Sequence, residues 1–187
     1  LLTVAMLLSN LMICAFATSA AASRLILNES YLEDPTGTIA PSTLADRKFT
    51  SFEGMLARGY TPSVYWIKLQ ILPQAQLKES LVLRIRPTYI DIIELFHANP
   101  SRPEQISAID RTGDRSPWSA DEYQSLNSNF LLSGSTLPST VYLRVQTTST
   151  VLVYPQLLAL EDALAADRNL DIFGGLLIGV LSMILFW

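Results

Sequence analysis

The residues that could carry out catalysis are few in this sequence of 187 residues, which contains one histidine, His97, and one cysteine, Cys14. A Ser-His-Asp triad would have to use His97, which ends a predicted strand and has no nucleophile elbow near it. One histidine and one cysteine cannot assemble a zinc site, and no P-loop or dinucleotide-binding fingerprint is present. We therefore predict a surface role for His97, no catalytic residue, no cofactor and no enzymatic activity for this chain.

Aromatic and arginine side chains point instead to binding. Aromatic rings can stack on the apolar faces of sugars, while charged groups beside them fix the orientation of the ligand. Trp66 and its neighbour Tyr65 lie in a strand-like segment, where packing in the core is the alternative interpretation. Trp118 lies in a polar loop, where we expect it to be exposed. The candidate ligand-binding residues are Trp66, Arg84, Arg86, Tyr89, Trp118 and Tyr123.

A second group of candidate residues is acidic and lies in the segment 110–122 (DRTGDRSPWSADE). Carboxylates in a loop that contains Gly113 could hold a calcium ion through hard oxygen ligands. The spacing fits no standard calcium loop, and Arg111 and Arg115 partly neutralise the charge, so a solvated turn is the preferred interpretation. The calcium candidates are Asp110, Asp114 and Asp121, with Glu122 beside them.

The elements that must position these side chains are β-strands. Apolar and polar residues alternate along 64–71, 81–86 and 91–97, which is the pattern of a half-buried strand and places Arg84 and Arg86 on a solvent face. Only the segment 35–60 is irregular, with one short helix expected near 52–57. Weaker patterns predict three further strands, at 24–28, 105–109 and 129–132, and two more strands, at 140–146 and 151–157, are joined by a Thr/Ser-rich turn. Eight short strands with polar turns predict an all-β fold, an antiparallel sandwich.

The two ends of the chain differ from the middle in charge. All 30 charged residues (13 Lys+Arg and 17 Asp+Glu) lie between Ser23 and Asp171. The apolar segment 1–22 ends in an A-x-A site, which predicts a signal peptide whose cleavage would remove Cys14; an uncleaved anchor helix is the alternative. The apolar segment 172–187 predicts the start of a first transmembrane helix that the sequence cuts short. A buried core helix is the alternative there.

These predictions divide the chain into four parts. A signal peptide covers 1–22, an exported β-sandwich covers 23–157, a helical juxtamembrane linker covers 158–171, and the transmembrane helix begins at 172. The net charge of −4 is spread along the chain. We therefore expect no nucleic-acid partner, since nucleic-acid binding favours a basic stripe.

Three segments resemble a known family. Residues 65–69 (YWIKL) are similar to a strand with the pattern YW-aliphatic-R/K-aliphatic, residues 81–83 and 89–96 (LVL, YIDIIELF) to the block that follows it, and residues 140–145 (TVYLRV) to its "LYLRV" strand. On these motifs the sequence resembles the second type of extracellular sensor domain of bacterial seven-transmembrane receptors with diverse intracellular signalling modules. The resemblance runs from Arg24 to the first span.

The resemblance carries several expectations that the residues alone do not. It implies a jelly-roll sandwich akin to carbohydrate-binding modules, located on the periplasmic side of the bacterial inner membrane. It also implies six further spans and a cytoplasmic output, commonly a diguanylate cyclase or a histidine kinase. The partners expected from it are a small ligand such as a glycan, the inner membrane and the receptor's own transmembrane bundle, and a homodimer is left open.

The leading hypothesis is therefore a periplasmic sensor domain, and two other functions are compatible with the sequence. A membrane-anchored protein-interaction domain of the cell envelope would present a flat apolar patch, where a sensor would present a concave site. An extracytoplasmic hydrolase would need two carboxylates lining a cleft, as in the hydrolysis of glycosides.

Overall fold

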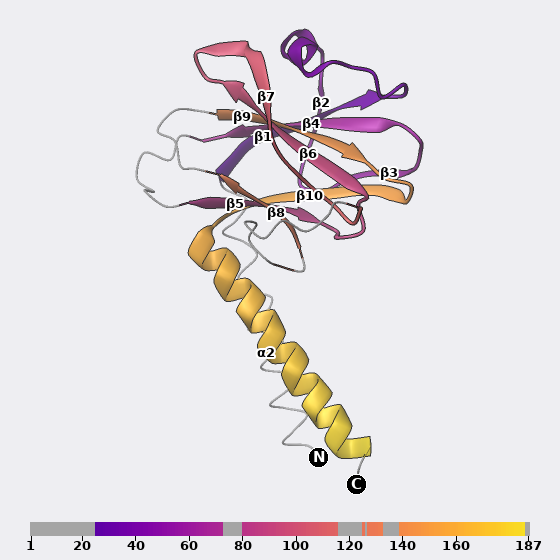
Figure 1. Cartoon of the computed structure of the whole chain (residues 1–187), viewed down its shortest axis with the longest axis vertical. Coiled ribbons are helices and arrows are strands. Elements are labelled where there is room, and N and C mark those ends of the chain that lie inside the picture. The colour runs from indigo at the N-terminus through magenta and orange to yellow at the C-terminus, as the bar shows by residue number, and fades with distance from the viewer. Residues whose placement is uncertain (1–24, 73–79, 116–124, 126, 133–138, 186–187) are drawn as a thin grey trace.

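The structure of this chain is a computed structural model, and it describes residues 25–72, 80–115, 125, 127–132 and 139–185. Within these ranges, ten strands form two antiparallel sheets, and a long helix leaves the domain at its C-terminal end (Figure 1). The strands are β1 (Ile26–Asp34), β2 (Thr50–Phe52), β3 (Leu56–Tyr60), β4 (Val64–Ile71), β5 (Leu81–Arg86), β6 (Ile92–Asn99), β7 (Arg102–Thr112), β8 (Ser128–Leu132), β9 (Ser139–Gln146) and β10 (Thr150–Ala159). The helices are the 3₁₀ helix η3 (Pro41–Asp46) and the α-helix α2 (Leu160–Leu185).

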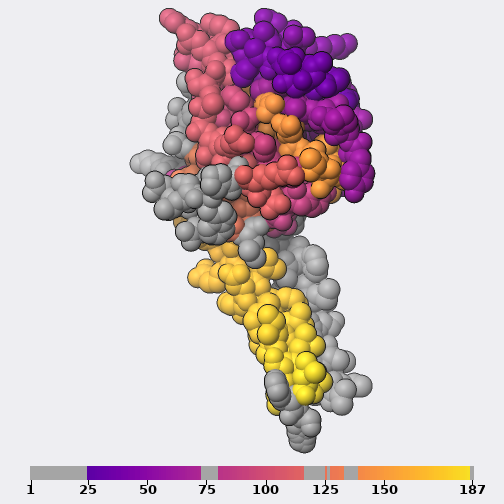
Figure 2. Space-filling view, turned by 45° about the vertical axis from the view of Figure 1, so that its right-hand side comes forward, coloured from indigo at the N-terminus to yellow at the C-terminus, as the bar shows by residue number. Residues whose placement is uncertain are grey.

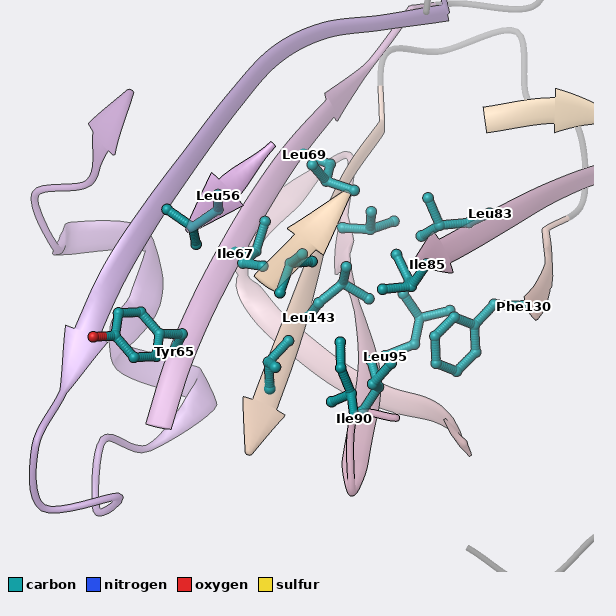
Figure 3. Packing of buried hydrophobic residues seen from close by; sticks show 14 of the residues in the cluster. Leu56, Tyr65, Ile67, Leu69, Leu83, Ile85, Ile90, Leu95, Phe130 and Leu143 are labelled. Atoms are coloured by element: carbon teal, nitrogen blue, oxygen red, sulfur yellow. The ribbon is translucent and has the colours of Figure 1, made fainter. Parts of the chain in front are cut away.

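The two sheets pack face to face as a sandwich. The larger sheet has the strand order β2-β1-β4-β9-β6-β7, and the smaller one has the order β3-β10-β5-β8. Apolar side chains from both sheets meet between them, as Figure 3 shows for Ile67 and Leu69 of β4 opposite Leu83 and Ile85 of β5. The predicted all-β antiparallel sandwich is confirmed.

The strand alternation that the sequence predicted decides which side chains form this core. In β4, Tyr65, Ile67 and Leu69 are buried in the core, and the intervening residues lie on the opposite face of the sheet. A side-chain period of two places every second residue on the same face, so the register of β4 against β1 and β9 determines this whole set at once. The turn predicted at Asn99-Pro100 is present between β6 and β7.

The segment between β1 and β4 differs from the prediction. The short helix expected near 52–57 is wrong, because this segment crosses from one sheet to the other as two strands. Strand β2 pairs with β1 in the large sheet, while β3 pairs with β10 in the small sheet. Gly54 lies between them with a φ of 69°, a conformation that glycine adopts without steric cost. The helical turn occurs earlier, at η3, where Pro41 occupies the first helical position.

Strands β1 and β7 exceed their predicted lengths the most, and the cause is pairing with neighbouring strands. Strand β1 extends to Asp34 rather than ending at 28, because its backbone pairs with β4 along its whole length. Strand β7 covers 102–112 rather than 105–109, and pairs with β6 at the edge of the large sheet. Both contain exposed polar residues where an alternating pattern would show apolar ones, so periodicity alone finds only part of them.

The linker and the predicted transmembrane helix form one continuous helix. Strand β10 continues to Ala159, two residues beyond the predicted end, and α2 begins at the next residue. The helix extends away from the sandwich (Figures 1 and 2) and is long and apolar enough to cross a membrane. Its apolar residues are exposed, for example Leu176, Ile178 and Ile184. This exposure excludes the alternative of a core helix. The predicted signal peptide lies outside the described residues.

Candidate functional site

Trp66 lies on the outer face of the large sheet, where the chain itself covers it. Its side chain is 1% exposed, and its ring centroid is 5.3 Å from that of Phe96. Residues from η3 and its flanks pack over it and form what we call the outer cluster, which consists of Leu44, Trp66, Phe96, Ala98 and Tyr142, bordered by Leu32, Ile39, Phe49 and Ile106. The indole therefore offers no surface to a ligand in this conformation. Trp66 is a packing residue, as the alternative interpretation of its sequence position had it.

Lys68 borders the outer cluster and places a cation beside two aromatic rings. Its Nζ atom lies 5.7 Å from the ring centroid of Phe49 and 6.0 Å from that of Tyr142. A cation at this distance from a ring face is attracted by the ring quadrupole. Burial raises the pKa of Tyr142 above its usual range, so this phenol stays neutral at physiological pH.

Arg84 lies on the outer face of the small sheet, as its strand position predicted, but it is not exposed to solvent. Its side chain is 1% exposed. The guanidinium donates from Nη2 to Oδ2 of Asp167 in α2 at 2.8 Å and from Nε to Oδ1 of Asn129 in β8 at 3.1 Å. The expectation of a solvent-facing arginine is wrong, because the first turns of α2 cover this face. Its partners are Asn129 of the sandwich and Asp167 of α2, and their contacts with the guanidinium argue against direct contact with a ligand.

Asp167 is the centre of a polar network between the sandwich and the helix. In addition to Arg84, Ser125 donates from Oγ to Oδ2 at 2.9 Å, and Asn127 donates from Nδ2 to Oδ1 at 3.3 Å. Both carboxylate oxygens therefore accept hydrogen bonds from the sandwich. Asn129 completes the network through Arg84, and we refer to these five residues as the helix joint.

The turn between β5 and β6 keeps two of the predicted binding residues exposed. Arg86 ends β5 with an exposed side chain, and Tyr89 is 40% exposed three positions later. The backbone of the turn after β7 is bonded to the same segment, from Asp114 N to Ile90 O at 2.9 Å and from Arg115 N to Asp91 O at 3.0 Å. One end of the sandwich thus carries an aromatic ring and two exposed arginines, Arg86 and Arg115.

Asp91 holds this end of the sandwich together. Its carboxylate accepts hydrogen bonds from the backbone N and the Oγ1 of Thr148, both at 2.8 Å, and Arg115 lies 3.8 Å away. These bonds from Thr148 lower the pKa of Asp91 below its usual value. Gly113 packs so closely that an added Cβ would lie 2.5 Å from the carbonyl oxygen of Asp91. The motif residue Asp91 therefore positions the turns that present Tyr89 and Arg115.

Of the remaining predicted residues that the structure describes, Asp114 lies at this end, in the turn whose backbone bonds to Ile90. Trp118, Tyr123, Asp121 and Glu122 lie outside the described residues. Asp110 lies in β7 and accepts a bond from the backbone N of Arg111, whereas Asp114 lies in the following turn. Within the described ranges, no three His, Cys, Asp or Glu side chains lie close enough together to hold a metal ion.

His97 lies within β6, opposite Val141 of β9 and Ser107 of β7. It shares the strand face of Ile93 and Leu95, which point into the core, and is half-buried near the end of the strand. The side chain of His97 is thus partly accessible to solvent, which is compatible with the surface role that the sequence predicted.

The sequence analysis missed Asp167 as a functional residue. It lies 83 positions from Arg84, so no local spacing connects the two. The available signal was an arginine in the middle of the apolar strand 81–86 and a group of acidic residues, Asp167 among them, in the helical segment that follows the last strand. A charged side chain on a surface that becomes buried needs a partner of opposite charge, which could have suggested the pairing.

The comparison with known families agrees with the motifs in the sequence. The chain matches the family model described as 7TMR-DISM extracellular 2 over residues 28–159, which is more than half of its length. The match begins within β1 and ends at the last residue of β10, so it covers the sandwich and stops where α2 begins. No curated protein shows significant similarity to the chain.

Proposed function

Since this chain belongs to the 7TMR-DISM extracellular 2 family, we propose that it binds a small ligand outside the cell and passes the signal to the membrane through α2. An extracellular sensor domain followed by an apolar helix makes it a membrane-anchored protein with an outward-facing domain. Membership of a sensor family indicates a non-enzymatic chain. The membrane we propose is the bacterial inner membrane, with the domain facing the periplasm.

The observation that carries this proposal is the direct connection of the sandwich to α2. Leu160, the first helical residue, follows β10 without a loop and donates its backbone N to the carbonyl oxygen of Ser80 at 3.1 Å. Ala163 is completely buried, and Asp167 bonds to the buried Arg84. A change in the small sheet would therefore move a helix that can cross a membrane.

We place the ligand at the end of the sandwich that carries Arg86, Tyr89 and Arg115. Both outer faces of the sandwich are covered around Trp66 and Arg84, whereas these three side chains are exposed on turns that Asp91 holds in place. An aromatic ring and two guanidinium groups exposed at the same end of the sandwich suit a polar ligand such as a glycan, particularly one that carries a carboxylate or a phosphate.

Ligand binding would act by favouring one arrangement of the sandwich and α2 over another. A ligand shifts such an equilibrium only by the difference between its affinities for the two states. The output that we propose is a diguanylate cyclase or a histidine kinase beyond further membrane spans, as the family resemblance implies.

The test is a thermal-shift screen of the chain in lipid nanodiscs against neutral and acidic glycans and divalent cations. A ligand that binds only the folded state raises Tm in a saturable way. We expect an acidic glycan to raise Tm, and Arg86→Ala and Tyr89→Ala to remove the shift. Matched controls are Arg102→Ala and Tyr60→Ala, which change an exposed arginine and an exposed tyrosine elsewhere. A shift that survives both site variants would contradict this location.

A further inference from the structure

Attaching α2 to the sandwich through the helix joint costs free energy, because two charges become buried. Arg84 is 1% exposed and the side chain of Asp167 is 20% exposed, so both charges have lost most of their hydration. The cost of desolvating two charges can exceed the gain from their attraction, and apolar residues of the same size often stabilise a fold at least as well. Stability alone therefore does not explain why an ion pair occupies this position.

An ion pair at this position can fix where α2 lies, because its hydrogen bonds depend on distance and alignment. Among the described residues, the carboxylate of Asp167 accepts bonds from three side chains that come from two parts of the domain, β5 and the residues just before β8. A shift of α2 by one helical turn, about 5.4 Å, would break all three bonds. The joint is therefore satisfied in one position of the helix, whereas an apolar contact would tolerate small displacements.

The joint also contains a group that the present arrangement leaves unsatisfied. Among the described residues, Nδ2 of the buried Asn129 has no hydrogen-bond partner. A buried donor without a partner costs free energy that a different arrangement can recover. This lowers the free-energy difference between the observed arrangement and one in which the side chains of the joint exchange partners.

We propose that the Arg84–Asp167 ion pair is a releasable latch that holds α2 in one of two positions on the small sheet. This inference rests on the proposed sensor function and specifies its regulation. A movement of β8, or of Ser125 and Asn127 before it, removes acceptor bonds from Asp167 and weakens the latch. The helix then changes position while the apolar core between the sheets stays intact.

The test measures the position and local stability of α2 in the chain embedded in lipid nanodiscs, without any ligand. One spin label is attached at Ser107→Cys in β7 and one at Asn169→Cys in α2, both exposed positions, with Cys14→Ser as background. Asp167→Asn removes the charge and keeps the shape of the side chain. We expect a broader or bimodal distribution of distances between the labels.

Hydrogen exchange provides the second readout, on the chain without labels. In Asp167→Asn, the backbone amides of 164–168 should exchange faster by about tenfold or more, the loss expected for one charge-assisted hydrogen bond. The amides of β4 and β9 in the core should keep their protection. The matched control is Asp171→Asn, an exposed aspartate one turn further along the same helix, which should change neither readout.

Two outcomes would contradict the proposal that the Arg84–Asp167 ion pair is a releasable latch. An unchanged distance distribution in Asp167→Asn would show that other contacts determine the position of α2. Loss of protection in β4 and β9 together with α2 would show that the pair supports the whole fold rather than a separate movement. Failure of the ligand screen would count against the proposed function alone, because this experiment uses no ligand.

Discussion

Each outer face of the sandwich has one region that another part of the chain covers, around Trp66 on the large sheet and around Arg84 on the small sheet, but the chemistry of the two covers differs. On the large sheet, η3 and its flanks cover Trp66 with apolar side chains. On the small sheet, the start of α2 covers Arg84 with a carboxylate. Apolar burial is non-directional and scales with area, whereas an ion pair depends on distance and on the alignment of donor and acceptor. The first cover stabilises the domain, and the second specifies a position.

This difference matters because only one of the two covers continues into the membrane. Residues 35–49 connect two strands of the same domain, so their displacement would cost stability without an output. Helix α2 extends away from the sandwich, so a small rotation at the helix joint is carried along its length (Figure 1). A position-specific and breakable contact is therefore located where movement can be transmitted.

The largest effect on stability is expected from the apolar cover. Leu44 is completely buried in the outer cluster, and Leu44→Ala should lower the free energy of unfolding by about 3 kcal/mol through lost burial and the resulting cavity. Denaturant unfolding followed by tryptophan fluorescence measures this loss. Leu131→Ala is the control, since Leu131 is 55% exposed and should change stability by less than about 1 kcal/mol. If Leu44→Ala and Leu131→Ala lowered the free energy of unfolding equally, the packing of η3 on the large sheet would contribute little to stability.

A smaller, pH-dependent effect is expected from a polar contact that does not involve α2. Asp91→Asn weakens the two bonds from Thr148 and should cost about 2 kcal/mol at pH 7. The pKa of Asp91 is lower in the folded state, so its charge stabilises the fold above pH about 4 and this contribution is lost as the pH falls through the folded pKa. The difference in the free energy of unfolding between the two proteins should shrink as the pH falls below about 4, through the lowered pKa of Asp91 in the folded state. A difference that stays constant below that pH would assign the loss to packing; Asp114→Asn, in the neighbouring turn, is the control.

A half-buried ion pair on the large sheet should contribute less still. Arg144 Nη1 lies 2.9 Å from Glu94 Oε2, with both side chains about a quarter exposed. Glu94→Gln should cost less than about 1 kcal/mol, because solvent screens the pair and a neutral hydrogen bond can remain. Thermal unfolding measures this loss of stability. If Glu94→Gln lowered the free energy of unfolding as much as Leu44→Ala does, polar contacts would stabilise the domain as strongly as apolar ones, and the comparison of the two covers would be wrong.

The smallest change in stability is expected when the whole latch is replaced. Arg84→Met combined with Asp167→Leu fills the same space with apolar side chains, and the free energy of unfolding should stay within about 1 kcal/mol of the original or rise. The single variant Arg84→Met, which removes the guanidinium that donates to Asp167, is the comparison and should be less stable than the double variant. A large loss in the double variant would mean that the ion pair is needed for folding itself.

The sequence could predict the exposure of a proposed binding residue only where neighbouring residues in the sequence decide that exposure. Tyr89 and Arg86 flank a turn marked by proline, and both are exposed as their local sequence suggests. Trp66 and Arg84 have the correct strand face, yet both are buried. Their exposure depends on segments that lie far away in the sequence, η3 for one and α2 for the other.

The sequence by itself determined eight of the ten strands, their inward faces and the apolar helix that follows, because periodicity and hydropathy act between near neighbours; β2 and β3 formed instead through pairing with strands of the two sheets. It also determined the family, through motifs such as YIDIIELF, in which Asp91 proves to hold two turns together. Only the tertiary structure decided that Arg84 bonds to Asp167 and that the outer faces are covered. Contacts between residues 83 positions apart depend on how the sheets and the helix pack, which no local pattern records.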